Sequence, residues 1–223
     1  SSIGTAVGTS SFTDDDSAGI NIDSPAPVAE GNGPGDSTID FTVSIDQSDP
    51  DNNITVDYAI SGGNEDTDTG TLTFLAGTGT LTQTVSVTTT GDTVVESDEA
   101  VSVTLSNASA NSSIGTAVGT SSFTDDDSAS VTIADVDGNE DDGAITVSAT
   151  LDNAVDGGFT VQVFTLDGTA TIADSDYTLI NALTLTFTGN AGEVQTFDVT
   201  PIADALIEGN ETLTISMDNL GST

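Results

Sequence analysis

Hydrophobic and polar residues alternate along most of the chain, which is the pattern of a β-strand with one buried face. Ile39, Phe41, Val43 and Ile45 alternate with Asp, Thr and Ser, and similar stretches recur as far as Met217. Clusters of Gly, Asn, Asp and Pro, such as EGNGPGDS and QSDPDNN, separate these stretches. No segment has the periodicity of a helix of useful length. The pattern therefore predicts an all-β fold in which short antiparallel strands, about seven per domain, form an Ig-like seven-stranded β-sandwich.

One segment of 18 residues, SSIGTAVGTSSFTDDDSA, occurs at residues 1–18 and returns unchanged at residues 112–129. The offset of 111 residues suits one small β domain per repeat and is too long for one coil of a solenoid. We expect residues 1–18 to be the last strand and acidic terminus of a preceding repeat. Residues 19–129 are expected to form a complete repeat, and residues 130–223 a second repeat that is truncated before its final strand. The chain is thus predicted to be a window on a longer tandem array of β-sandwiches.

The chain contains 37 acidic residues and no Lys, Arg, His or Cys, so its formal charge is −37. Hydrophobic residues still make up 35% of the sequence, which is enough for a folded core and argues against disorder. Ions from solution must offset the repulsion, and bound divalent cations do so better than screening by salt. A surface without cations disfavours binding to nucleic acid and to anionic membranes, and the lack of Cys excludes disulfides and thiolate metal sites. No apolar run is long enough for membrane insertion.

Acidic residues gather in three loop motifs of the complete repeat, namely the Glu of PVAEG, the pair in ESDE and the triplet DDD. Ca²⁺ takes roughly six to eight oxygen ligands and tolerates irregular geometry, whereas transition metals prefer the His and Cys that this chain lacks. A single acidic triplet is more often a solvated turn than a set of ligands. If carboxylates from these loops gather in one cluster, they repel one another unless a cation lies among them, which favours a Ca²⁺ site.

The order of these motifs resembles that of the Calx-β domain, a module of sodium–calcium exchangers, integrin β4 and many giant bacterial surface proteins. In residues 130–223 the resemblance rests on DGTATIADSDY followed by LTLTFTGNAGEVQTFDVTPIADALIEGNETLTISMDN. In residues 19–129 it rests on PVAEG, GTLTFLAGTGTLTQTVSV, VVESDEAVSVTLS and FTDDDSA. It covers almost the whole chain and implies tandem sandwiches of the Calx-β type.

The resemblance also implies Ca²⁺ as the bound cofactor, held by carboxylates from several loops at the end of a sandwich that adjoins the next domain. In the complete repeat the matching positions are Glu30, Asp68, Glu96, Glu99, Asp125, Asp126 and Asp127, with Asp66 as the alternative to Asp68. In the second repeat they are Glu140, Asp174, Asp176, Glu208 and Glu211. The second repeat has no terminal acidic triplet of its own.

By resemblance to long bacterial adhesins, the chain is expected to be a structural stalk segment of a secreted, cell-surface repeat adhesin. Its tandem β-sandwiches would be stiffened by interdomain Ca²⁺ and would act in cell adhesion or in surface motility such as gliding. The expected location is extracellular, on the surface of a Gram-negative bacterium. The expected partners are neighbouring repeats of the same chain, further copies associated laterally into filaments, and a distal surface or glycan ligand.

Two other functions stay open at this point. A calcium-sensing regulatory module would use the same carboxylates, although identical tandem segments are unusual for a sensor. A ligand-binding repeat for glycans or ice would use the Thr-rich strands such as TLTQTVSVTTT. We do not expect an enzyme, because only carboxylate chemistry is available and the chain has no Trp and 2 Tyr for stacking on a sugar.

Overall fold

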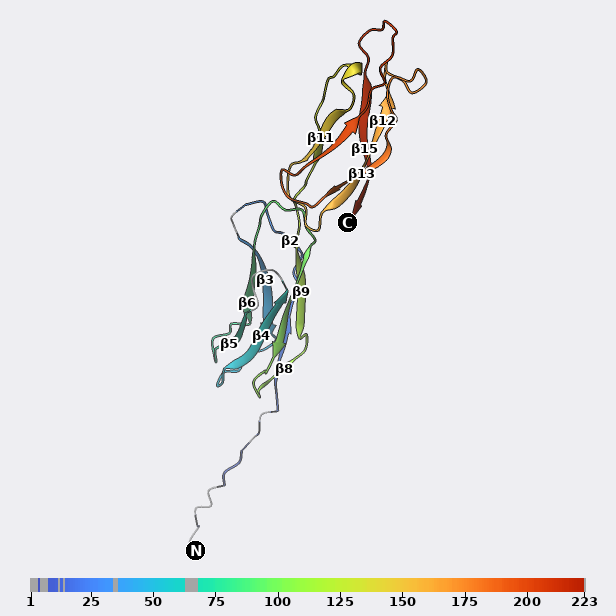
Figure 1. Cartoon of the computed structure of the whole chain (residues 1–223). Helices are drawn as coiled ribbons and strands as arrows, with labels where there is room; N and C mark the ends of the chain where they lie inside the picture. Colours follow the sequence, from blue (N-terminus) through green and yellow to red (C-terminus); the bar gives the residue numbers. More distant parts are fainter. Residues whose placement is uncertain are drawn as a thin grey trace. The chain divides into compact units, whose positions relative to one another are not determined.

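The computed structural model describes residues 4, 8–11, 13, 15–33, 36–62 and 68–222. The chain folds as two compact units, each drawn in Figure 1. Unit 1 comprises Ser1–Val28, Asp36–Thr89 and Glu99–Phe123. Unit 2 comprises Ala29–Gly35, Thr90–Asp98 and Thr124–Thr223. Two short segments from the first half of the sequence, Ala29–Gly35 and Thr90–Asp98, therefore belong to unit 2.

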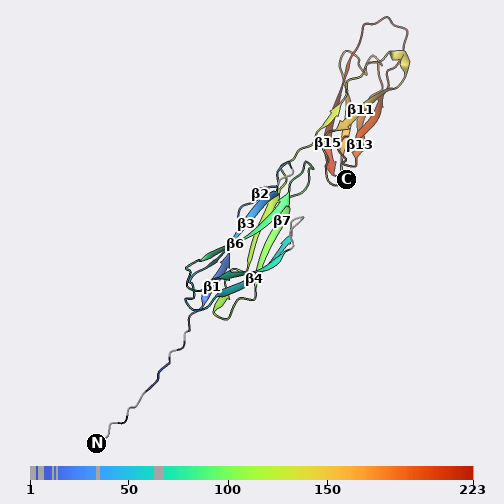
Figure 2. The same cartoon turned by 90° about the vertical axis from the view of Figure 1, so that its left-hand side faces the viewer.

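The first half of the chain forms a two-sheet sandwich whose strands run along the length of unit 1 (Figure 2). One sheet has the order β6 (Thr82–Thr90), β3 (Asp36–Ile45), β1 (Ala18–Ile22), β8 (Ser112–Ile114). The other has the order β2 (Val28–Ala29), β9 (Val118–Thr124), β7 (Glu99–Ser106), β4 (Ile54–Gly62), β5 (Thr69–Phe74). Neighbours are antiparallel in β1–β3, β4–β5, β4–β7 and β7–β9, whereas β1 and β8 are parallel.

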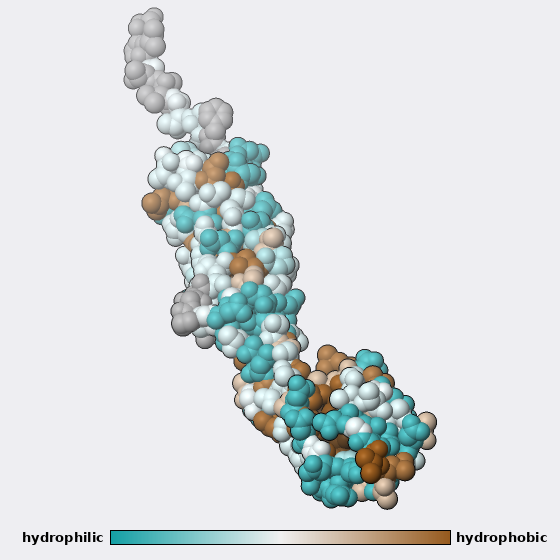
Figure 3. Space-filling view, turned by 90° about the horizontal axis from the view of Figure 1, so that it is seen from above, coloured by the Kyte–Doolittle hydropathy of each residue, from teal (hydrophilic) through white to brown (hydrophobic). Residues whose placement is uncertain are grey.

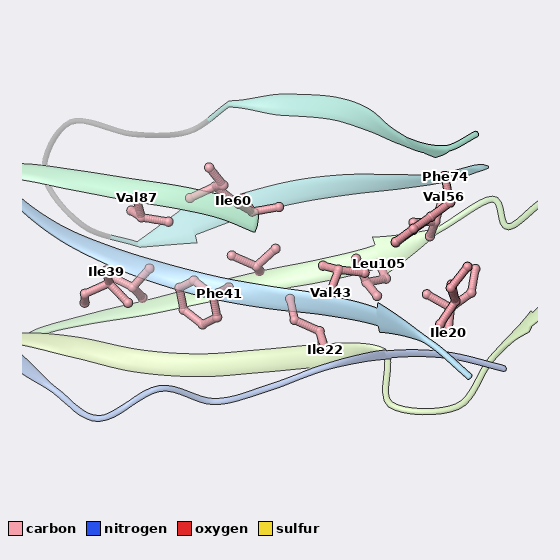
Figure 4. Packing of buried hydrophobic residues seen from close by; sticks show 14 of the residues in the cluster. Ile20, Ile22, Ile39, Phe41, Val43, Val56, Ile60, Phe74, Val87 and Leu105 are labelled. Atoms are coloured by element: carbon pink, nitrogen blue, oxygen red, sulfur yellow. The ribbon is translucent and has the colours of Figure 1, made fainter. Parts of the chain in front are cut away.

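The core of unit 1 lies between these sheets and follows the alternation of the sequence. On β3 the side chains of Ile39, Phe41, Val43 and Ile45 are all buried, and the intervening residues are half-buried or exposed. Figure 4 shows Ile39, Phe41 and Val43 between the two sheets, and residues of the opposite sheet such as Val56 belong to the same cluster. Burial of branched and aromatic side chains on one face of each strand therefore drives this sandwich together.

The second half of the chain forms a smaller sandwich in unit 2. One sheet has the order β10 (Val131–Ile133), β11 (Ile145–Leu151), β14 (Val194–Val199). The other has the order β13 (Asn181–Phe187), β12 (Phe159–Asp167), β15 (Leu213–Ser222). Its core includes Val147, Leu151 and Val163, and the stacked rings of Phe159 and Phe187, whose centroids are 5.0 Å apart. The short 3₁₀ turn η1 (Glu140–Asp142) is the one helical element of the described residues.

The predicted all-β fold of tandem sandwiches is confirmed. The repeat boundaries stay a prediction, and of the segment expected to be the last strand of a preceding repeat, residues 1–3, 5–7, 12 and 14 lie outside the described residues. The described residues before Ala18 belong to no strand. No helix in the described part of the chain is long and apolar enough to cross a membrane. Hydrophilic and near-neutral residues cover most of the face seen in Figure 3, with separate hydrophobic patches between them.

The loop between β13 and β14 is organised by the carboxylate of Glu193. It accepts hydrogen bonds from the Thr188 backbone N–H at 2.8 Å, from the Thr188 hydroxyl at 2.9 Å, from the Gly189 N–H at 3.1 Å and from the Gln195 amide at 2.8 Å. These donors, the Thr188 N–H foremost, lower the pKa of Glu193 to about 2. The fold of the loop therefore stabilises the ionised form of the Glu193 carboxylate.

Replacing Glu193 by Gln should lower the thermal midpoint of unit 2 by a few degrees near neutral pH. Because the folded pKa lies below the ordinary value, the stabilisation by Glu193 is present above pH 4.5 and is lost as the pH falls towards 2. Melting curves followed by circular dichroism should show the difference between wild type and Glu193→Gln closing over that range. The matched control is Asp156→Asn, which removes one exposed charge from unit 2. A difference that is independent of pH would contradict this account.

Candidate metal centres

Three loops bring carboxylates together in unit 2 to form the first acidic triad, which we define as Glu30, Asp92 and Asp127. Glu30 directly follows β2, Asp92 follows β6, and Asp127 follows β9. One carboxylate oxygen from each residue lies within 4.8 Å of the others. Strands distant in sequence therefore end at one place and present three acids to one point.

Backbone hydrogen bonds fix the loop after β2 against the loop after β9. The Glu30 N–H donates to the carbonyl of Thr124 at 3.0 Å, and the Gly31 N–H donates to Asp126 Oδ1 at 3.1 Å. The side-chain amide of Asn32 donates to Asp127 Oδ1. Asp126 and Asn32 thus position the two loops, which leaves the second oxygen of Asp127 to face the triad.

The three carboxylates of the triad differ in burial: Glu30 is buried, Asp127 is half-buried and Asp92 is exposed. Glu30 is only 5% exposed, and its burial, with the nearby charges of Glu96, Asp92, Asp125 and Asp127, raises its pKa to about 7. Burial also raises the pKa of Asp127, helped by Asp125 and Asp126 and opposed by the hydrogen bond from Asn32. Asp127 Oδ2 is buried and has no hydrogen-bond partner among the described residues. Because the sequence contains no Lys, Arg or His, no side-chain cation can offset these charges.

A second group of acids surrounds Glu208 at another place in unit 2, on the loops before β11, after β12 and before β15. Glu208 belongs to two overlapping triads, one with Glu140 and Asp204 and the other with Asp176 and Glu211, each with ligand oxygens within 4.8 Å. Burial and the neighbouring carboxylates raise the pKa of Glu208 and of Glu211. Apart from half-buried Asp176 these acids are exposed, so this group is more open than the first triad.

The loop after β12 holds Asp176 in place for this second group. Asp176 Oδ2 accepts from the Thr171 N–H at 2.7 Å, and Asp174 Oδ2 accepts from the Thr171 hydroxyl at 3.0 Å. The hydroxyl of buried Tyr177 donates to Asp167 at 2.7 Å and anchors the same loop. Asp174 therefore supports the loop through Thr171, while Asp176 contributes an oxygen to a triad.

The expected ligands fall into residues inside a triad and residues beside one. Those inside are Glu30, Asp127, Glu140, Asp176, Glu208 and Glu211. Outside the triads of the described residues are Asp68, Glu96, Glu99, Asp125, Asp126 and Asp174.

Among these outer residues, Asp125 Oδ1 accepts from the Asp127 N–H at 3.3 Å. Glu99 Oε2 is buried without a hydrogen-bond partner in the described part of the chain. Asp68 accepts from the N–H of Thr69 instead, at 2.7 Å. Asp66, the alternative to Asp68, lies outside the described residues.

Two triad members, Asp92 and Asp204, are absent from the set expected from the sequence. A shared spacing marks both of them, because the sequence reads DTVVESDE from Asp92 and DALIEGNE from Asp204. In each repeat an Asp therefore precedes the ExxE pair by the same interval. This D-x-x-x-E-x-x-E pattern is the signal that could have identified them.

The donor set of the first triad fits a hard divalent cation. It offers carboxylate oxygens only, without nitrogen or sulfur ligands, and Ca²⁺ accepts such oxygens in mono- or bidentate fashion with waters completing its shell. Asp127 Oδ2, which is buried and has no hydrogen-bond partner in the described part of the chain, would be stabilised by a positive partner. The residues present therefore suit Ca²⁺ better than Zn²⁺ or Cu²⁺.

Gly91 is required where the loop after β6 passes the loop after β2. A Cβ atom at this position would overlap the carbonyl oxygens of Gly31 and Glu30. Replacing Gly91 by Ala should therefore push Asp92 and Glu30 apart and weaken Ca²⁺ binding about tenfold or more, measured by isothermal titration calorimetry. Gly8→Ala is the control, because it adds a Cβ at a glycine that has open space around it and no positive φ. Equal affinities of Gly91→Ala and wild type would contradict this packing argument.

Comparison with known proteins gives a family for the chain. The Calx-beta domain matches it twice, over residues 14–137 and residues 123–223. Similar solved structures include CBD12 from CALX1.2, at 18% identity over 92% of this chain and 82% of that one, with a TM-score of 0.39.

The calcium binding domain CBD12 of CALX1.1 is similar at 20% identity over 92% of this chain and 81% of that one, with a TM-score of 0.40. The apo-form Calx CBD1 domain is similar at 21% identity over 50% of this chain and 100% of its own, with a TM-score of 0.42. No curated protein matches the chain. Two consecutive domain matches together span nearly the whole sequence, and the chain therefore belongs to the Calx-β domain family.

Proposed function

We propose that the chain is a structural stalk segment of a secreted, cell-surface repeat adhesin whose tandem β-sandwiches are stiffened by Ca²⁺. The observation that carries this proposal is the first acidic triad, which gathers Glu30, Asp92 and Asp127 in a chain that has no cation of its own. Charges this close, one of them on a buried side chain, repel one another unless an ion lies among them. Ca²⁺ is the partner that the oxygen-only donor set favours.

Binding of Ca²⁺ at this triad would restrain the chain where it passes from one unit to the next. Each ligand lies on a segment of unit 2 that follows a strand of the first sandwich, after β2, β6 and β9. A single ion would therefore bind all three of these segments. The conformational entropy that the segments lose would be offset by the free energy gained when the ion neutralises their charges. A series of such joints would give an extended and stiff array, which suits a stalk that holds a binding tip away from a cell.

The proposed location is extracellular, on the surface of a Gram-negative bacterium, with a role in adhesion or surface motility. The modest affinities of extracellular Ca²⁺ modules, on the order of 10⁻⁴–10⁻³ M, match an exposed and partly hydrated site. Proposed partners are neighbouring repeats, further copies of the chain in filaments, and a distal surface or glycan ligand. A net charge of −37 makes lateral contact between copies dependent on divalent ions or high salt.

Stiffening of the chain by Ca²⁺ is tested by pulsed electron–electron double resonance, which measures the distribution of distances between two spin labels. The native chain has no Cys, so Ser48→Cys on unit 1 and Thr196→Cys on unit 2, both exposed positions, give a pair with no competing label site. Millimolar Ca²⁺ should narrow the distribution of label distances, and the same pair in an Asp92→Asn/Asp127→Asn chain should show no narrowing. A distribution that Ca²⁺ leaves unchanged in the native background would overturn the proposal.

The Ca²⁺ affinity of the native chain distinguishes a stalk from a calcium sensor. Calorimetric half-saturation between about 0.1 and 1 mM supports a site that is permanently filled outside the cell. Half-saturation below about 10 µM is the range of intracellular sensors and would favour regulation instead.

A further inference from the structure

The loop after β2 contains the pair Asn32–Gly33, which is the one place in the sequence where Asn directly precedes Gly. Every other Asn is followed by a residue that has a side chain. Glycine has no Cβ and adopts backbone conformations that other residues avoid. In an Asn-Gly pair the main-chain nitrogen of the glycine therefore reaches the side-chain amide carbon of the asparagine with little obstruction.

The structure leaves both groups of this pair accessible. The side chain of Asn32 is exposed, and residues 32 and 33 lie in a bend outside the strands. Among the described residues, the Gly33 N–H donates no hydrogen bond. A Cβ atom built on Gly33 would meet no heavy atom within 4 Å. Neither a strand ladder nor tight packing therefore keeps the Gly33 nitrogen away from the Asn32 amide.

We propose that Asn32 is a site of spontaneous deamidation in the folded protein, and that the carboxylate so formed adds charge to the first acidic triad. The Gly33 nitrogen attacks Asn32 Cγ, the N–Cγ bond forms, the Cγ–Nδ2 bond breaks, and ammonia leaves with the proton of the Gly33 N–H. Water then opens the cyclic imide. Attack on Cγ gives aspartate, and attack on the main-chain carbonyl carbon gives isoaspartate. In sum, an amide and water become a carboxylate and ammonium.

The position of Asn32 makes this change of charge matter. Its side-chain amide donates a hydrogen bond to Oδ1 of Asp127, a member of the first acidic triad. Burial raises the pKa of Asp127, and the hydrogen bond from Asn32 opposes that shift. Deamidation replaces the donor by a negatively charged oxygen, so an attraction to Asp127 becomes a repulsion.

The isoaspartate product also changes the path of the main chain, which then runs through Cβ and Cγ of residue 32. The residues just before it are held to the loop after β9. The Gly31 N–H donates to Asp126 Oδ1 at 3.1 Å, and the Glu30 N–H donates to the Thr124 carbonyl at 3.0 Å. An additional main-chain carbon next to these contacts shifts the loop, whereas the aspartate product adds the charge alone.

The added charge should act in opposite directions without and with Ca²⁺. Without the ion, no Lys, Arg or His of this chain can offset it, so unit 2 loses stability. With the ion, a larger number of nearby negative charges favours binding, as the charge of the ligand set does in other Ca²⁺ sites. This second effect rests on the proposed Ca²⁺ function of the triad, whereas the deamidation and the loss of stability do not.

Peptide mapping by mass spectrometry tests the modification. After incubation with chelator in mildly alkaline buffer, the folded chain should show the conversion of amide to carboxyl at Asn32 ahead of every other Asn, and isoaspartyl methyltransferase should label the same peptide. Gly33→Ala should slow the conversion severalfold, because its methyl group obstructs the attacking nitrogen. Asn32 that persists in the folded chain while the urea-denatured chain converts would overturn the proposal. Equal rates in wild type and Gly33→Ala would overturn it as well.

Thermal unfolding of two variants tests the effect on the triad. Asn32→Asp and Asn32→Ala both lack the amide donor, but only the first adds a charge. In chelator, Asn32→Asp should melt a few degrees below Asn32→Ala, and millimolar Ca²⁺ should close or reverse that difference. Equal midpoints in chelator would show that the charge does not act on the triad and would overturn this part of the proposal. A difference in chelator, with no effect of Ca²⁺ on either variant or on wild type, would support the added charge and contradict the proposed function alone.

Discussion

Chelation of Ca²⁺ is expected to lower the thermal unfolding midpoint of unit 2 by about 10 °C. At a free Ca²⁺ concentration of about 100 times Kd, a ligand that binds only the folded state stabilises it by about 2.7 kcal/mol. The effect is large here because the ion relieves the electrostatic repulsion between the carboxylates and also gains coordination bonds to their oxygens. Without it, Glu30 and Asp127 hold buried carboxylate charge with no cationic side chain in the chain to offset it.

Differential scanning calorimetry with millimolar Ca²⁺, and again with excess chelator, measures this shift. Asp127→Asn should remove most of the shift, since Asp127 is a triad ligand whose Oδ2 is buried and lacks a hydrogen-bond partner among the described residues. Asp156→Asn, which removes the same charge from an exposed position of unit 2, should leave the shift intact. If Ca²⁺ changes neither unfolding transition of the native chain, the triads are solvated acidic surface and the stalk proposal loses its mechanism.

The fold was predictable from the sequence because its signal is local. Alternation along β3 fixes which side chains face the core, and Phe41 and Val43 are fully buried as the pattern predicts. Strand pairing is not local. Ala18 of β1 pairs with Ser112 of β8, and Asp57 of β4 pairs with Ser106 of β7. Alternation along one strand does not indicate which other strand pairs with it, so the order of strands in each sheet was not predictable from the pattern.

The first triad was only partly predictable for a related reason. Glu30 and Asp127 stand in motifs whose order resembles a known domain. Asp92 is marked only by its spacing from the ESDE motif, and the sheet topology brings it to the other two. Asp68 satisfies a neighbouring backbone N–H in place of joining a triad. Sequence spacing indicates which loops are acidic, while the sheet order decides which of those loops meet.

The pH dependence of stability should reverse between the Ca²⁺-free and the Ca²⁺-bound protein, and Glu30 is the main cause. Its folded pKa of about 7 lies above its ordinary value of 4.5. Without Ca²⁺, the stability that Glu30 contributes is therefore fully present below pH 4.5 and is lost as the pH rises through about 7. With Ca²⁺, protons compete with the ion for the same oxygens, so stabilisation by Ca²⁺ should grow as the pH rises over that interval.

Glu30→Gln separates these two effects, because glutamine keeps the size of the side chain and removes its charge. Without Ca²⁺, the variant should melt several degrees above wild type near pH 8, and the difference should vanish near pH 4, where Glu30 is itself neutral. With Ca²⁺, the variant should melt below wild type near pH 8, because a ligand has been lost. A variant that melts below wild type near pH 8 without Ca²⁺ would show that Glu30 is held by favourable contacts as a charged group. Ca²⁺ binding would then have to be driven by Asp127 and Asp92, with no contribution from relief of charge repulsion at Glu30.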